Sequence, residues 1–109
     1  MVLDKAPEAT AVIGLTDSIA LSILARAKQR GVDVPRDLSI VGFDDIPEAA
    51  LSDPPLTTLH GSAAGNGRAA VELLLDGGPP RQVWMPVHLV RRGSAASPRR
   101  EAVGRTHGD

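Results

Sequence analysis

Short apolar runs alternate with stretches of helical spacing along the chain. The run at residues 11–15 is flanked by polar residues, and its length is typical of a strand buried on both faces of a parallel sheet. Residues 16–18, Thr-Asp-Ser, are N-cap types that stand directly before a helical pattern. Gly31 then supplies the left-handed residue that commonly follows a helix, so the pattern predicts a strand and then a helix that stops at this glycine. The apolar stripe of this helix consists of Ile19, Ile23, Leu24 and Ala27.

A second strand and a short helix are predicted next. Residues 38–43 are mostly apolar and end in the acidic pair at 44–45. Residues 46–52 predict a short helix, which Asp-Pro-Pro at 53–55 terminates because proline cannot continue a helix. Residues 56–59 predict a third, short strand.

Helical spacing returns over residues 61–76, where three glycines favour a helix start near Asn66. Residues 83–90 alternate with a period of two, which predicts a strand. Pro86 cannot donate a ladder hydrogen bond, so we expect this strand at a sheet edge or bulged at the proline. Residues 94–109 are small, polar and charged without a period, which predicts a disordered tail after a domain of residues 1–93.

The order of these elements predicts an α/β fold with a mainly parallel sheet and helices outside it, because strand–helix–strand units make right-handed crossovers. In open sheets of this kind, ligands bind beyond the carboxyl ends of the strands. Two such ends carry polar residues, Thr16 and Asp17 after the first strand and Asp44 and Asp45 after the second. If the two strands run in the same direction, these groups face one crevice.

Each polar group has a functional and a structural interpretation. A carboxylate at a strand end can accept charge-assisted hydrogen bonds from hydroxyls or an amine of a small ligand. Both acids can instead be turn or cap residues before the short helix. Neighbouring residues of an extended backbone point in opposite directions, so at most one of Asp44 and Asp45 is expected to reach a ligand. Thr16 and Asp17 can likewise contact a ligand or only cap the helix.

Composition excludes several function classes. The 109 residues carry 12 Lys and Arg against 13 Asp and Glu, a net charge of -1, which argues against an autonomous nucleic-acid binder and against a polybasic membrane module. Cysteine is absent, which excludes a disulfide scaffold, a thiolate metal site and a cysteine nucleophile. No apolar run approaches the roughly 20 residues of a membrane span, and no leader opens the chain, so we expect a cytoplasmic protein.

Sequence motifs for catalysis and cofactors are also missing. The segment after the first strand, GLTDS, matches neither common phosphate-binding glycine loop, and no nucleophile elbow occurs. His60 and His88 do not have the spacing of metal ligands, and the pair Arg91-Arg92 is expected to be solvated. We therefore expect no metal and no cofactor.

Residues 10–94 resemble the C-terminal part of LacI/GalR-type transcriptional regulators. The most specific pieces are RGVDVPRDLSIVGFDDIP and SDPPLTTLH, in that order, with MPVHLVRRGS after them. The resemblance implies a regulatory region of two lobes, like a periplasmic sugar-binding protein, with a small sugar or purine effector between the lobes. It also implies that operator DNA is bound only through an N-terminal helix-turn-helix, which this chain lacks, so we expect an incomplete lobe.

The resemblance further implies roles for individual residues. Asp44 stands where the family places an effector-binding aspartate, and Asp17 matches a recurrent aspartate at a helix start. Thr16 stands where many members carry a ligand-contacting asparagine, and its shorter reach implies a different effector or a lost contact. Leu21 and Leu51 lie where family dimers meet, which implies a homodimer.

We therefore expect the effector-sensing portion of a LacI-type regulator, which binds a sugar-like or purine-like ligand and catalyses nothing. One alternative is a transport-type sugar-binding domain, which needs an export signal that the chain does not show. The other is a small enzyme that uses Asp44 and Asp45 as acid and base, although no nucleophile or metal ligand stands beside them.

Overall fold

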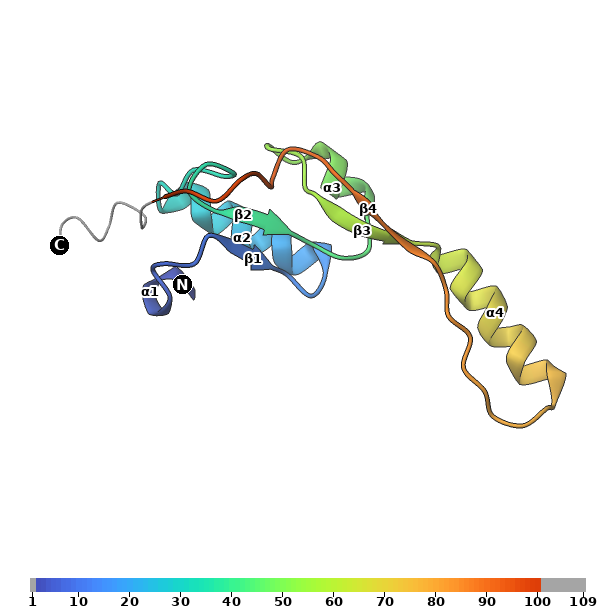
Figure 1. Cartoon of the computed structure of the whole chain (residues 1–109). Coiled ribbons are helices and arrows are strands. Elements are labelled where there is room, and N and C mark those ends of the chain that lie inside the picture. The colour runs from blue at the N-terminus through green and yellow to red at the C-terminus, as the bar shows by residue number, and fades with distance from the viewer. Residues whose placement is uncertain (1, 101–109) are drawn as a thin grey trace.

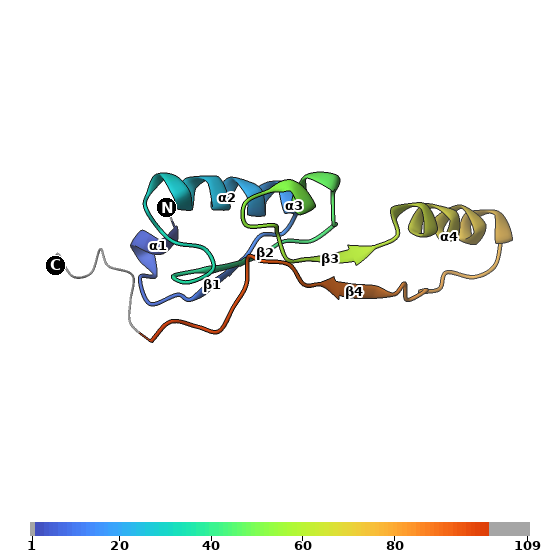
Figure 2. The same cartoon turned by 90° about the horizontal axis from the view of Figure 1, so that it is seen from above.

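The computed structural model describes residues 2–100, which form an elongated molecule of 63 × 27 × 21 Å (Figure 1). The helices and strands, in chain order, are α1 (Val2–Lys5), β1 (Ala11–Ile13), α2 (Asp17–Gln29), β2 (Ser39–Val41), α3 (Pro47–Leu51), β3 (Thr58–Gly61), α4 (Ala63–Asp76) and β4 (Val87–Val90). We call β1, β2, α2 and α3 the body. We call β3, α4, the following loop and β4 the arm, because Figure 2 shows them projecting away from the body.

The body is built on parallel strands, as the sequence predicts. β1 and β2 pair in parallel with Val12 opposite Ile40, and Val41 forms a further parallel bridge with Thr57 just before β3. Helices α2 and α3 lie together on one side of these strands (Figure 2). The structure therefore has an α/β arrangement in which β1, β2 and the start of β3 run in the same direction.

Helix α2 begins and ends where the sequence predicts. The Thr16 hydroxyl oxygen accepts a hydrogen bond from the Ile19 backbone N–H at 3.2 Å, and Gly31 follows the helix with a φ of 72°. The buried face differs from the predicted stripe, because Ala20 is buried and Ile19 is 46% exposed. A Cβ placed on Gly14 would overlap Ala20, so the helix approaches β1 most closely where both residues are small.

The apolar core lies between α2, α3 and the parallel strands. Loop residues between α2 and β2 contribute as much to it as the strands do, which the strand and helix periodicities do not predict. The buried apolar residues are Ala20, Leu24, Ala27, Val32, Val34, Leu38, Ile40, Ala49 and Leu56.

The arm differs from the predicted elements in two ways. β4 is antiparallel to β3 and begins at Val87 rather than at Val83, because Pro86 cannot donate to the ladder. α4 begins at Ala63, and not near Asn66, because the Ser62 hydroxyl caps the Gly65 N–H at 2.9 Å. Gly77 ends α4 in the left-handed conformation, as expected, and no residue of α4 is buried.

Residues 91–100, which we call the C-terminal segment, run back from the arm along the body (Figure 1). Ser94 is fully buried, and its hydroxyl donates to the Ile40 carbonyl and accepts from the Thr57 N–H at 2.8 Å. The Ser39 hydroxyl donates to the Ala96 carbonyl at 3.1 Å and accepts from the Ala96 N–H at 2.9 Å. This segment therefore completes the hydrogen bonding of β2.

Arg99 extends these contacts to the start of the chain. Its guanidinium donates to the carbonyls of Pro7, Ala9 and Asp37 at 2.6–2.7 Å. The structure thus holds the chain in place up to Arg99, where the sequence predicted a disordered tail from residue 94. The remainder of that predicted tail, residues 101–109, lies outside the described residues.

Candidate functional site

The carboxyl ends of β1 and β2 meet at one edge of the body. The backbone N–H of Asp17 donates to the carbonyl of Phe43 at 2.9 Å. This hydrogen bond joins the peptide group between Thr16 and Asp17 to the peptide group between Phe43 and Asp44, so Thr16 and Asp44 lie on adjacent segments of the same edge. The prediction that two parallel strands bring these residues together is confirmed at the level of the backbone.

The turn after β2 separates the two acids of the pair. Asp44 and Asp45 both have positive φ, 131° and 63°, a region that residues with a side chain rarely adopt. The Asp44 backbone N–H donates to the Leu59 carbonyl at 2.9 Å, while its side chain is exposed and bonds to nothing within residues 2–100. Asp45 is turned inward and half-buried. The turn therefore leaves one carboxylate free, as the sequence predicts, and uses the other internally.

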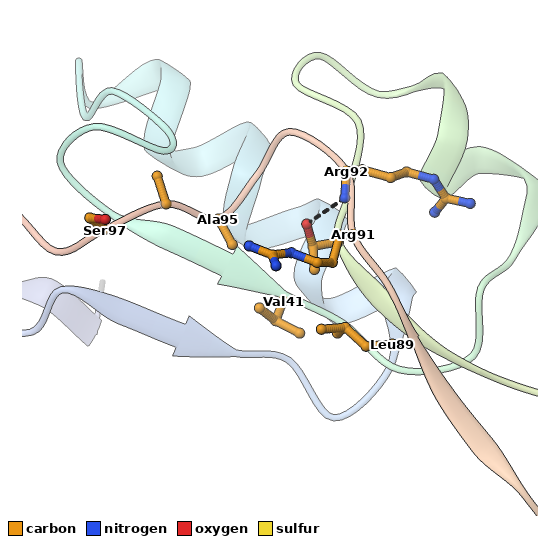
Figure 3. Close-up of a pocket in the computed structure, with 8 residues that line it drawn as sticks. Val41, Leu89, Arg91, Arg92, Ala95 and Ser97 are labelled. Carbon is orange, nitrogen blue, oxygen red and sulfur yellow. Dashed lines mark hydrogen bonds between the residues drawn. The ribbon is translucent and has the colours of Figure 1, made fainter.

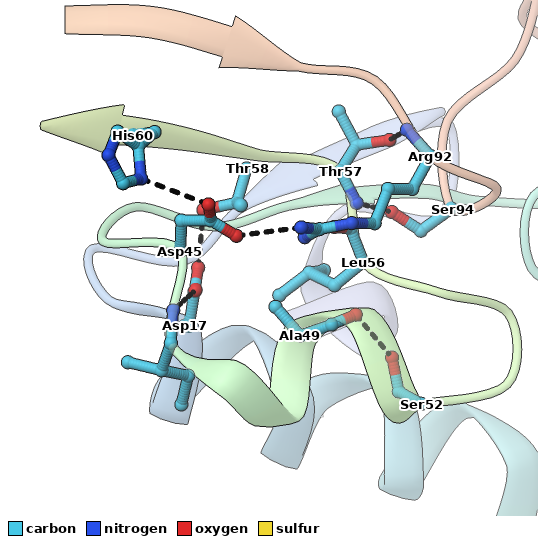
Figure 4. A network of polar contacts seen from close by, with 11 residues as sticks. Asp17, Asp45, Ala49, Ser52, Leu56, Thr57, Thr58, His60, Arg92 and Ser94 are labelled. Atoms are coloured by element: carbon cyan, nitrogen blue, oxygen red, sulfur yellow. Dashed lines mark hydrogen bonds and ion pairs between the residues drawn. The ribbon is translucent and has the colours of Figure 1, made fainter.

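Asp45 is held by two side chains that the sequence did not single out as functional (Figure 4). Arg92 forms an ion pair with one carboxylate oxygen at 2.8 Å, and these side chains are 19% and 18% exposed. Nδ1 of His60 donates to the other oxygen at 3.0 Å, since an ionised carboxylate can only accept. The expectation that Arg92 is solvated is therefore wrong. Both partners stand inside the motifs MPVHLVRRGS and SDPPLTTLH, which is the signal that could have identified them.

The Arg92 guanidinium beside Asp45 holds the pKa of that carboxyl below its ordinary value of 3.8, and the hydrogen bond from His60 acts in the same direction against the effect of burial. A carboxyl whose pKa is lowered by folding adds stability above its unfolded pKa, and this stability is lost as the pH falls through the folded pKa. We therefore expect wild type to exceed Asp45→Asn in free energy of unfolding above pH 3.8, with the difference vanishing at lower pH. Urea denaturation over a pH series measures this.

The control for this pH series is Asp76→Asn, which removes the exposed ion pair with Arg81 at 2.7 Å. Exposed pairs contribute about 0–1 kcal/mol, so this variant should follow wild type closely at each pH. A difference between wild type and Asp45→Asn that grows on acidification would contradict the assignment.

Asp17 has a different environment from the one predicted for a ligand contact. Its side chain is fully buried, one oxygen accepts from the Ile46 N–H at 2.9 Å, and the other accepts from the Thr58 hydroxyl at 2.5 Å. A Cβ on Gly42 would overlap this carboxylate, so the glycine leaves room for it. Asp17 therefore joins the starts of α2, α3 and β3 beneath the site, and a direct ligand contact is not available to it in this arrangement.

The pocket shown in Figure 3 lies beside the C-terminal segment. Its volume is about 300 Å³, and besides that segment it is lined by the last residue of β2, the residue before β3 and one residue of β4. The lining residues are Val41, Thr57, Leu89, Arg91, Arg92, Ala95, Ala96 and Ser97. Within residues 2–100, no group of three His, Asp or Glu side chains is placed to hold a metal ion, and no helix has the length and apolar character to cross a membrane.

The two leucines predicted at a dimer interface are exposed to different extents. Leu51, at the end of α3, is 81% exposed. Leu21 on α2 is half-buried and packs partly against the core. Leu51 therefore offers the larger free apolar surface.

Comparison with known proteins gives consistent matches. Residues 2–95 match the family model of the periplasmic binding protein-like domain. The chain is 48% identical over 96 residues to the HTH-type transcriptional regulator MalR of Streptomyces coelicolor, covering 83% of this chain and 28% of that protein. It is 42% identical over 97 residues to the HTH-type transcriptional repressor CytR of Escherichia coli, covering 84% and 28%.

A solved structure with a similar fold is that of the transcriptional regulator CelR in complex with cellobiose. The TM-score is 0.80 at 31% identity, covering 86% of this chain and 30% of that one. The chain thus spans less than a third of the length of each of these three proteins. MalR and CelR are named as transcriptional regulators, and CytR is named as a transcriptional repressor. The chain therefore belongs to the family of periplasmic binding protein-like domains, in the form found in LacI-type transcriptional regulators.

Proposed function

We propose that this chain is the effector-sensing portion of a LacI-type transcriptional regulator, and that it binds a small polyhydroxylated effector at the carboxyl ends of β1 and β2. The observation that carries this proposal is the hydrogen bond between the Asp17 N–H and the Phe43 carbonyl. It joins the segments of Thr16 and Asp44 at one edge, where the Asp44 carboxylate is exposed.

The chemistry of this edge suits a sugar. The free carboxylate of Asp44 can accept hydrogen bonds from two adjacent hydroxyls, and such charge-assisted bonds are about twice as strong as neutral ones. The Thr16 oxygen already accepts the Ile19 N–H, but its hydroxyl hydrogen remains available to donate. The structural similarity to a regulator in complex with cellobiose supports the sugar class. A nucleobase, which also carries N–H donors, is the alternative ligand.

Asp17 supports the site from below in this proposal. Its buried bonds to Ile46 and Thr58 hold together the three segments that meet at the edge. It is therefore a positioning residue and not a ligand contact.

The experiment is isothermal titration of the chain with cellobiose, sucrose, glucose and adenine. We expect a sugar to bind wild type and Asp44→Asn to weaken its binding by about tenfold or more, because the carboxylate supplies charge-assisted bonds. Asp53→Asn is the matched control, since Asp53 is also exposed and follows α3 rather than β2. Equal affinity of wild type and Asp44→Asn for a bound sugar would contradict the site. Binding of adenine alone would favour the nucleobase class.

We further propose that the regulator works as a homodimer in the cytoplasm, with operator DNA bound through a separate N-terminal domain. Leu51 and the exposed part of Leu21 lie on α3 and α2, which are on the same side of the body (Figure 2). An effector that favours one arrangement of the lobes would then change the operator affinity of the dimer.

Leu51→Arg is expected to weaken self-association of the chain by about tenfold or more, because burying a leucine side chain contributes roughly 1.5–3 kcal/mol. Sedimentation equilibrium measures the dimer constant. Leu75→Arg is the matched control, because Leu75 is 78% exposed on the arm. Equal dimer constants for wild type and Leu51→Arg would place the interface elsewhere.

A further inference from the structure

Asp45, the acid of the turn whose side chain points inward, is bonded to the arm and to the C-terminal segment rather than to its own part of the chain. Arg92 lies two residues beyond β4, and His60 lies within β3, where its ring faces that of His88 at a centroid distance of 5.1 Å. Figure 4 shows His60 on β3 and Arg92 on the C-terminal segment, both with their side chains directed toward Asp45. The conformation of the turn therefore depends on side chains that are distant in sequence.

Arg92 is held in place by hydrogen bonds other than its ion pair with Asp45. Its guanidinium donates to the Leu56 carbonyl at 2.9 Å, and its backbone N–H donates to the Thr57 hydroxyl oxygen at 3.0 Å. Most of its side chain is shielded from solvent. Surface ion pairs lose much of their value because two mobile side chains must be ordered. Here the cation is already ordered, so the pair can constrain the backbone of Asp45.

The turn needs such constraints because its backbone is strained. Asp44 and Asp45 are consecutive non-glycine residues with positive φ, a conformation that persists only where the surrounding structure determines it. The bond from the Asp44 N–H to Leu59 acts before the turn, and that from the Ile46 N–H to Asp17 acts after it. Between these two bonds, the side chain of Asp45 is the remaining anchor.

We propose that Asp45, Arg92 and His60 form a positioning clamp, which holds the strained turn so that the Asp44 carboxylate stands at the effector site. This inference rests on the proposed function and deepens it. None of the three clamp residues contacts the effector. Because His60 belongs to the arm, effector binding and the position of the arm are coupled through this residue. The coupling is reciprocal, so a bound effector also holds the arm in place.

The test uses Asp45→Asn in the full chain, because asparagine tolerates the left-handed backbone and removes only the charge. We expect the hydrogen-exchange protection factor of the Asp44 amide to fall about tenfold, the size of one lost charge-assisted hydrogen bond. We expect the dissociation constant of the sugar found by titration to rise by a similar factor. The amide of Ile40, which donates to the Ser94 carbonyl in the core, should lose less protection than the Asp44 amide, and no more than the change in free energy of unfolding accounts for. A loss of global stability alone would lower the protection of both amides by the same factor.

Two further variants separate the clamp from its surroundings. Arg92→Gln should cause the same changes, and the double variant with Asp45→Asn should cause little further change, because the two residues act as one unit. Asp76→Asn, which removes the ion pair to Arg81 at the far end of the arm, should change neither readout.

The outcomes distinguish the clamp from the proposed function. If none of the four probes binds wild type, the proposed function fails, and the exchange of the Asp44 amide still decides the clamp. Unchanged protection at Asp44 in Asp45→Asn overturns the clamp whether or not a sugar binds. Protection that falls equally at Asp44 and Ile40 also overturns it, because Asp45 would then act on global stability alone.

Discussion

Asp17→Ala is expected to lower the free energy of unfolding by about 3 kcal/mol, because two buried donors lose their acceptor at about 1–3 kcal/mol each. The donors are the Ile46 N–H and the Thr58 hydroxyl, and no water can replace the carboxylate without entering a fully buried position. Urea denaturation followed by circular dichroism measures the loss.

The matched comparison for this prediction is Asp17→Asn against Asp44→Asn. Asparagine keeps the volume at position 17 but offers one acceptor where the carboxylate offers two, so we expect an intermediate loss of about 1–2 kcal/mol. Asp44 is exposed, so its variant should change stability by less than about 0.5 kcal/mol. Equal stabilities of Asp17→Ala and wild type would show that the buried carboxylate does not join the three segments.

Leu56→Ala is expected to lower the free energy of unfolding by about 3 kcal/mol, within the range for removing a buried leucine side chain. Leu56 is fully buried beneath the Asp45 and Arg92 pair (Figure 4). Its backbone bonds, from its N–H to Ala49 and from Arg92 to its carbonyl, can remain in the variant. The loss therefore reports side-chain packing, and thermal and urea denaturation both measure it.

Leu74→Ala is the control for this prediction, because Leu74 is 80% exposed on α4 and its truncation should cost less than about 0.5 kcal/mol. A loss at position 56 no larger than that at position 74 would mean that the core relaxes around the missing side chain. Asp17 and Leu56 both pack closely against Gly42, at the end of β2 just before the turn, so the two variants test whether the site is supported there.

The functional residues of this chain differ in how far local patterns identify them. The turn residue Asp44 was identifiable, because an acidic pair after an apolar strand is visible in the sequence itself. Arg92 and His60 were not, because their roles depend on an antiparallel pairing that brings β3 and β4 beside the turn. Pairs of basic residues and single histidines are usually exposed to solvent in proteins, so these residue types do not by themselves indicate a structural role. Only the pairing of β3 with β4 shows that Arg92 and His60 have one.

Local physical chemistry in the sequence determined the elements that a few neighbouring residues control. Thr16 caps α2, Gly31 and Gly77 end their helices, and the apolar runs become parallel strands that bring residues 16 and 44 to one edge. Each of these outcomes depends on a hydrogen bond or a backbone preference that acts within a few residues, or on the direction that strand–helix–strand units impose.

The tertiary structure alone decided which polar groups are buried and which face of each element packs. Asp17 is buried where the hydroxyl of Thr58, 41 positions away in sequence, donates a hydrogen bond to its carboxylate. Ser94 is buried where its hydroxyl donates to the carbonyl of Ile40, 54 positions away. Helix α2 buries the face that carries Ala20 because this small residue lies against Gly14, which directly follows β1. Hydrogen bonds and close approaches between distant segments have no periodicity along the chain, so only the folded arrangement reveals them.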